Sequence, residues 1–76
     1  MSWNYRVMKR MIGKEEVFQI HEVYYNDDET ISAWTENPSN PQGETLDELK
    51  KDFLMQLRAL EEPILDYDQL VIEHAK

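Results

Sequence analysis

The 76-residue sequence has no cysteine, only two glycines and no long apolar run, and these absences remove several classes of protein. Without cysteine the chain can form no disulfide, and it has no thiolate for binding zinc or attacking a substrate. No segment approaches the roughly 20 apolar residues of a membrane-spanning helix, and the N-terminus lacks the apolar stretch of a secretory signal. We therefore expect a soluble, cytoplasmic protein that is not bound to a membrane.

Basic residues are also scarce, since eight Lys and Arg stand against sixteen Asp and Glu, which gives a formal net charge of −8. Residues 1–14 contain four of the eight bases and no acid, so residues 15–76 hold four bases against sixteen acids, a local charge of −12. This balance argues against direct binding of nucleic acid and leaves room for a basic partner protein. The bases of the first segment are explained as charges that keep an edge strand from aggregating.

Three segments have the residue pattern of β-strands: 3–12, 15–26 and 30–36. The first alternates well enough for a half-buried strand, and the second is rich in β-branched and aromatic residues on both faces. Gly13-Lys14 and the polar stretch 26–29 supply the two turns. The pattern predicts an antiparallel meander of three strands.

A helix follows a loop at 37–43, where two prolines and a glycine should stop the sheet. Thr45 and Glu48 have the spacing of a capping box, which marks a helix start. The helix should end near Glu62, because Pro63 disfavours helical backbone in the residue before it. Between these ends, five apolar residues recur at spacings of three, four, four and three, which predicts the buried face of the helix: Leu46, Leu49, Phe53, Leu57 and Leu60.

These elements predict an α+β fold, a three-stranded antiparallel meander with one C-terminal helix packed on one face. The β-β-β-α domain should occupy residues 1–62, and residues 63–76 should form an acidic C-terminal tail. One helix covers one face, so the other face would expose aromatic and β-branched residues, which predicts a homodimer or a partner protein. In the alternative, the C-terminal residues fold back over that face through Ile64, Leu65, Tyr67 and Leu70.

The polar residues offer no pattern typical of an enzyme. Adjacent His21 and Glu22 should point to opposite faces of a strand, so they cannot act as a catalytic pair. The acids at 27–29 lack the ligand spacing and interior glycine of a calcium loop, and no serine lies in a nucleophile or phosphate-loop motif. We therefore expect no catalytic residue, cofactor or metal.

The segment Gly-Glu-Thr-Leu-Asp-Glu-Leu at 43–49 follows a strand ending in Trp-Thr-Glu and a proline-containing loop. This arrangement resembles the HicB-like antitoxin family, and the resemblance covers residues 3–62 in the order of the elements. It implies a partly degraded, non-catalytic ribonuclease H-like domain that self-associates and neutralises a small basic toxin acting on messenger RNA. Family members usually add a DNA-binding segment, for which the fourteen residues after Glu62 are too few and too acidic.

Two functions follow as hypotheses. In the first, the protein is a non-catalytic, dimeric binding module that holds a small basic protein. In the second, it is a small-ligand-binding or accessory subunit, with the ligand between the loop at 37–43 and the aromatic strands. The first hypothesis assigns partner binding to seven residues: Trp3, Tyr5, Tyr25, Trp34, Asp47, Glu48 and Asp52.

The proposed helix start can be tested with Thr45→Ala. Loss of the capping hydroxyl should lower the free energy of unfolding by about 1 kcal/mol, a noticeable part of the stability of so small a domain. Denaturant unfolding measures this change. An unchanged midpoint would mean that the helix begins elsewhere.

Overall fold

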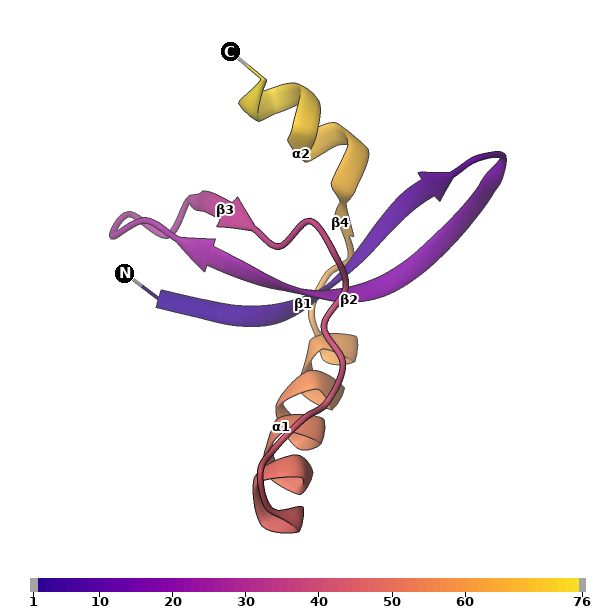
Figure 1. Ribbon diagram of the computed structural model, residues 1–76. Helices are drawn as coiled ribbons and strands as arrows, with labels where there is room; N and C mark the ends of the chain where they lie inside the picture. The colour runs from indigo at the N-terminus through magenta and orange to yellow at the C-terminus, as the bar shows by residue number, and fades with distance from the viewer. Residues whose placement is uncertain (1, 76) are drawn as a thin grey trace.

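A long, twisted hairpin forms the centre of the computed structural model, which describes residues 2–75 (Figure 1). Strand β1 (Ser2–Ile12) pairs antiparallel with β2 (Glu15–Tyr25) along its whole length. The turn between them contains Gly13, whose φ of 63° lies in the left-handed region that glycine adopts without strain. The hairpin thus follows the strand alternation and the turn that the sequence predicts.

Two short strands complete the sheet, one on each side of the hairpin. Strand β3 (Ile31–Trp34) pairs antiparallel with β2, and β4 (Leu65–Asp66) pairs parallel with β1 opposite Met8 and Lys9. The order is β3-β2-β1-β4, a curled mixed sheet.

The prediction of a three-stranded antiparallel meander with one helix is therefore wrong. In the described residues the sheet has four strands of mixed direction, and two α-helices accompany it. After Pro63 the chain returns to β1 and pairs with an edge that would otherwise leave backbone N–H and C=O groups unpaired. A strand of two residues is too short to show an alternation in the sequence, so the pattern could not reveal it.

Helix α2 (Tyr67–His74) lies over the face of the sheet that carries Met8 and Val23. Both of these side chains are completely buried, and Tyr67 and Leu70 pack against them. The Arg10 guanidinium stacks over the Tyr67 ring, 3.9 Å from its centre. The segment after Glu62, expected as an acidic tail, thus contains β4 and α2. It covers the face expected to be open through Leu65, Tyr67 and Leu70, as in the alternative above, whereas Ile64 is exposed.

Helix α1 (Leu46–Arg58) and the 3₁₀ turn η1 (Ala59–Glu61) lie on the opposite face of the sheet, the one that carries Tyr5 and Val7. The small side chain of Ala59 is buried against Tyr5 and Val7, with Ile20 beside them. The rest of α1 projects away from the sheet, so the molecule has the outline of a cross (Figure 1). The predicted helix is present, but it meets the sheet at its C-terminal end.

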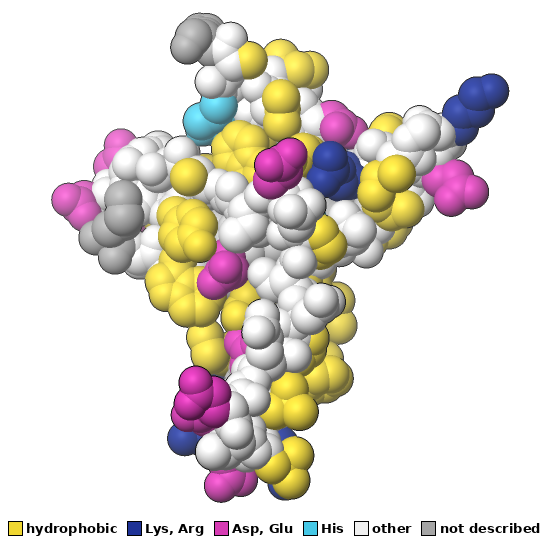
Figure 2. Space-filling view, in the orientation of Figure 1, with side chains coloured by type: hydrophobic (Ala, Val, Ile, Leu, Met, Phe, Trp, Pro, Cys, Tyr) yellow, Lys and Arg dark blue, Asp and Glu magenta, His cyan; other side chains and the backbone are white. Residues whose placement is uncertain are grey.

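The apolar face of α1 is not part of the core, contrary to the prediction from its spacing. We call Leu46, Leu49, Phe53, Leu57 and Leu60 the α1 stripe; these side chains are 37–67% exposed. Apolar surface runs down one side of the helix in Figure 2. The buried side chain within α1 is Gln56, and Asp52 is half-buried next to the sheet. The projection of α1 explains this, because a helix held at one end cannot press its long axis on the sheet.

The start of α1 follows the capping pattern with one difference. The Thr45 hydroxyl accepts a hydrogen bond from the Glu48 amide at 3.1 Å, as predicted. The Glu48 carboxylate accepts from the amide of Glu44 at 2.8 Å, one residue before the cap. A Cβ on Gly43 would lie 2.5 Å from the Leu49 backbone nitrogen, so a glycine lets the loop pass this close to α1.

The role of α2 in the core predicts a contrast between two of its residues. Leu70→Ala should lower the free energy of unfolding by about 2–4 kcal/mol, because it removes a buried side chain from the core with Met8 and Val23. Ile72→Ala on the exposed side of α2 should change it by less than about 0.5 kcal/mol. Urea unfolding of both variants measures the difference. Equal, small effects would show that α2 does not cover the sheet.

Candidate functional site: an acidic cleft beside the first helix

A cleft of about 490 Å³ lies between the sheet, the loop after β3 and α1. We call it the acidic cleft, because three of its lining residues are acids: Glu22, Glu36 and Asp52. No Lys or Arg within residues 2–75 lines it. The remaining lining is mostly polar: Tyr5, Thr35, Asn37, Pro38, Ser39, Asn40 and Gln42.

A hydrogen bond between β1 and α1 forms the floor of the acidic cleft. The Tyr5 hydroxyl donates to Oδ1 of Asp52 at 2.6 Å. The second oxygen of Asp52, Oδ2, accepts from the backbone amide of Gln42 at 2.9 Å. Asp52 therefore ties the strand, the helix and the loop together.

The bond between Tyr5 and Asp52 moves their two pKa values apart. Burial, and then the bond to Asp52, raise the pKa of Tyr5 from 10 to about 12. The Tyr5 hydroxyl, and then the Gln42 amide, hold the pKa of Asp52 below its ordinary value. At neutral pH Tyr5 stays a donor and Asp52 stays ionised, so neither group is poised for proton transfer. The pair supplies a fixed negative charge.

The carboxylate of Glu22 reaches the acidic cleft because of its register in β2. Glu22 lies opposite Tyr5, so both side chains project from the same face of the sheet. Its neighbour His21 points to the other face, where it is fully buried and its Nδ1 lies 2.9 Å from the Thr35 carbonyl oxygen. Burial lowers the pKa of His21, so the ring is neutral at neutral pH. The adjacent pair thus faces opposite ways, as the strand pattern predicts.

Backbone hydrogen bonds hold the loop that forms the outer wall. The amide of Thr35 donates to the Glu22 carbonyl at 3.0 Å, and the amide of Ser39 donates to the Ile20 carbonyl at 2.8 Å. On the far side of the sheet, Nη1 of Arg10 donates to the Glu36 carbonyl at 3.1 Å. The loop therefore extends the pairing along β2, and the wall is built into the fold.

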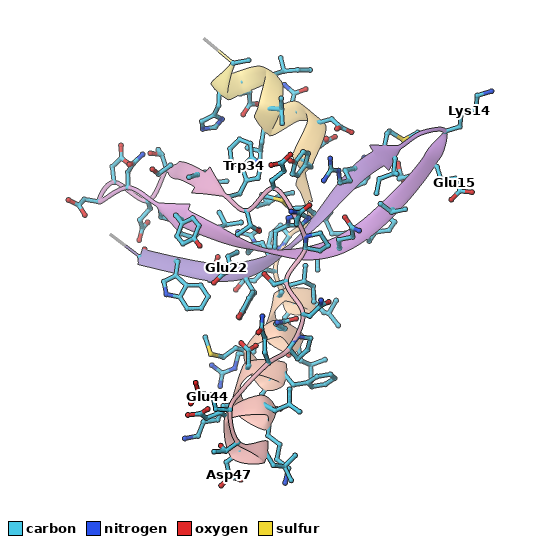
Figure 3. The ribbon with its side chains drawn as sticks, in the orientation of Figure 1. Lys14, Glu15, Glu22, Trp34, Glu44 and Asp47 are labelled. Atoms are coloured by element: carbon cyan, nitrogen blue, oxygen red, sulfur yellow. The ribbon has the colours of Figure 1, made fainter. Side chains whose placement is uncertain are left out.

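The structure brings together three of the seven residues predicted for partner binding. Tyr5 and Asp52 line the acidic cleft, and Trp3 packs edge-on against Tyr5, with ring centres 5.2 Å apart. Tyr25 and Trp34 pack against the core on the α2 side, so they are separated from the cleft by the sheet. Figure 3 shows Trp34 and Glu22 on opposite sides of the sheet.

The other two predicted residues lie at the first turn of α1. Asp47 is exposed there, and Glu48 is engaged in the helix cap. Glu44 and Asp47 mark the end of α1 that is distant from the sheet (Figure 3). They form a separate acidic end of the molecule and do not contribute to the cleft.

Sequence reasoning missed Glu22 and Glu36 as site residues. The alternation of β2 places Glu22 on the face of Tyr24, which was a usable signal. What was missing is the position of α1 and of the loop after β3, which together turn that face into a cleft. Glu36 follows β3 directly and enters the lining through the path of that loop.

Within residues 2–75 no helix is long and apolar enough to cross a membrane, and no three His, Cys, Asp or Glu side chains are grouped to hold a metal ion. Comparisons of the chain with protein-family models, with curated proteins and with solved structures gave no match.

The bond across the floor of the cleft predicts a pKa change. In Asp52→Asn the pKa of Tyr5 should fall from about 12 toward 10, because the negative acceptor is lost while burial remains. Ultraviolet titration of tyrosinate measures this, and a Tyr5→Phe variant identifies which of the four tyrosines is responsible.

Asp47→Asn is the matched control, because it removes the same charge from the exposed first turn of α1. Its tyrosine titration should match that of the unmodified protein. If Asp52→Asn also leaves the high-pH titration unchanged, the bond between Tyr5 and Asp52 does not form in solution.

Proposed function

We propose that the protein is a non-catalytic, self-associating protein-binding module, similar to the HicB-like antitoxin domain, that holds a small basic partner protein. The observation that supports it most directly is the acidic cleft, whose three carboxylates have no Lys or Arg in the lining. An Arg or Lys side chain of a partner fits such a site, because it adds the charge that the cleft lacks. The protein would act in the cytoplasm.

The cleft is prepared for a cation before any partner arrives. Tyr5 and Gln42 hold Asp52 in one position, so its charge needs no rearrangement on binding. Glu22, whose Oε2 accepts a hydrogen bond from the Tyr24 hydroxyl at 3.4 Å, and Glu36 add two further acids to the lining. Arg favours bidentate pairing with carboxylates of this kind. A net charge of −8 would also draw a basic protein toward the whole surface.

A nucleic acid is a poor match for the same cleft. Its phosphates would meet three carboxylates, and like charges repel. The basic residues of β1 are partly engaged within the fold, since Arg10 stacks on Tyr67 and Nη2 of Arg6 donates to the Pro63 carbonyl. A basic protein is therefore the partner that the charge distribution favours, and it is also the partner that the resemblance implies.

A small cationic ligand is the second candidate, favoured by one observation. The loop residues from Asn37 to Gln42 line the cleft together with Tyr5, which is where a loop-bound ligand was expected. Amide chemical shifts separate the two cases. A small amine that moves signals of the loop alone favours the ligand, and a protein that moves signals well beyond the cleft favours the binding module.

Charge removal at one position of β2 tests the binding module. A peptide of nine arginines serves as the probe, and calorimetry at low salt measures its dissociation constant. Glu22→Gln should weaken binding by about tenfold, because a charge-assisted hydrogen bond contributes about 1.5 kcal/mol or more.

Glu15→Gln is the matched control, since it lies on the same strand and removes the same charge at the hairpin tip, distant from the cleft (Figure 3). It should weaken binding by less than about twofold, through the general field alone. If both variants weaken binding equally, the peptide senses net charge and the cleft is not the binding site.

A further inference from the structure

The α1 stripe is a row of large apolar side chains that the fold leaves in solvent. Its five side chains cover one side of a helix that projects from the sheet (Figures 1 and 2). We propose that this stripe binds the α1 stripe of a second copy, with the two helices antiparallel about a two-fold axis at Phe53. The inference rests on the self-association in the proposed function and specifies its surface and geometry.

The spacing of the stripe is symmetric about Phe53. The intervals from Leu46 to Leu60 are three, four, four and three residues, so the pattern is the same in either direction. In an antiparallel pair Leu46 faces Leu60 of the second copy, Leu49 faces Leu57, and the two Phe53 rings meet on the axis. An isologous interface needs a self-complementary surface of this kind, and an unrelated partner would not require it.

The charges of α1 also favour the antiparallel direction. Its first turn carries Asp47 and Glu48, and its last turn carries Arg58. With Phe53 on the axis, Arg58 of each copy lies opposite Glu48 of the other, while Glu61 and Glu62 lie opposite Thr45 and Glu44. A parallel pair would place every charge beside its like, so the antiparallel direction is the more favourable of the two. The helix dipoles oppose one another in the same arrangement.

The area available is sufficient for a dimer. Given the exposed fractions of the stripe and of neighbouring Leu54, each copy presents on the order of 500 Å² of apolar surface, at the upper end for a monomer. Pairing two copies buries about 1,000 Å², the lower limit of a specific interface. Four of the five positions lie within the 13 residues of α1, and Leu60 lies in the 3₁₀ turn η1 that continues it.

The first part of the test is the mass of the full chain in solution. Sedimentation at about 100 μM should give twice the single-chain mass of 9.1 kDa. Leu57→Asp should raise the dissociation constant of the dimer by at least about a hundredfold, because it places a charge in the centre of the interface of both copies. Since Leu57 is half exposed, this variant should keep a cooperative melt.

Met55→Asp is the matched control, because it adds the same charge to an exposed position of α1 outside the stripe. It should leave the dissociation constant within about threefold of the unmodified value. A single-chain mass for the unmodified protein, or equal weakening by both variants, would overturn the proposal that the stripe pairs.

The second part uses the absence of cysteine, which makes any introduced thiol unique. Phe53→Cys should form a disulfide-linked dimer on mild oxidation, because the two residues meet on the axis. Leu46→Cys and Leu60→Cys should each fail to cross-link alone, since like positions lie about 21 Å apart in an antiparallel pair. A mixture of these two variants should cross-link.

The outcomes separate the geometry from the proposed function. Cross-linking of Leu46→Cys and Leu60→Cys each with itself would show a parallel pair and overturn the antiparallel geometry. A monomeric chain that still binds the arginine peptide through Glu22 would overturn this inference and leave the partner-binding function standing. A dimer whose affinity for the arginine peptide is unchanged by Glu22→Gln would support this inference and overturn the partner-binding function.

Discussion

The hairpin of β1 and β2 has apolar side chains on both of its faces, and both faces must be covered. Met8 and Val23 occupy one face, and Tyr5, Val7 and Ile20 occupy the other. Only a chain that crosses the edge of the sheet can supply cover to both sides. The short parallel pairing of β4 with β1 achieves this, because it leads the chain from η1 on one face to α2 on the other.

Because η1 and α2 cover opposite faces of the sheet, the rest of α1 is not needed for the core. A single small residue, Ala59, completes the core on its side, so the helix needs to touch the sheet at its end alone. The long apolar side of α1 is then left exposed, with no packing partner among residues 2–75. In a domain of this size such a surface is expensive to keep in water, and pairing with a second copy is the arrangement that its symmetry favours.

The same projection of α1 creates the acidic cleft. Because the helix stands away from the sheet, the loop after β3 has to bridge the space between them, and Asp52 is the residue that anchors it. The cleft and the α1 stripe therefore arise from one geometric fact, and they occupy different sides of one helix. The partner proposed for the cleft and the second copy proposed for the stripe would therefore occupy separate surfaces.

Much of the candidate site could be inferred from local pattern, and the remainder could not. The strand alternation placed Tyr5 and Val7 on one face and Met8 on the other, and the Thr45 cap located the start of α1. Tyr5 and Asp52 were predicted as site residues, but nothing local shows that one donates to the other, since 47 residues separate them. Tyr25 and Trp34 pack against the core on the α2 side, and local pattern could not show this because the cover of that face comes from residues far along the chain.

The sequence by itself determined the elements with a strong repeat: the hairpin, its glycine turn, the loop with two prolines and the amphipathic helix. Tertiary structure alone decided which faces of those elements are buried and which residues pack against them. Periodicity records that one side of a helix is apolar, but burial depends on whether another surface reaches it. For the apolar side of α1 no surface in the described part of the chain does, because the two-residue strand β4 leads the chain across the sheet edge and places Tyr67 and Leu70 on the opposite face.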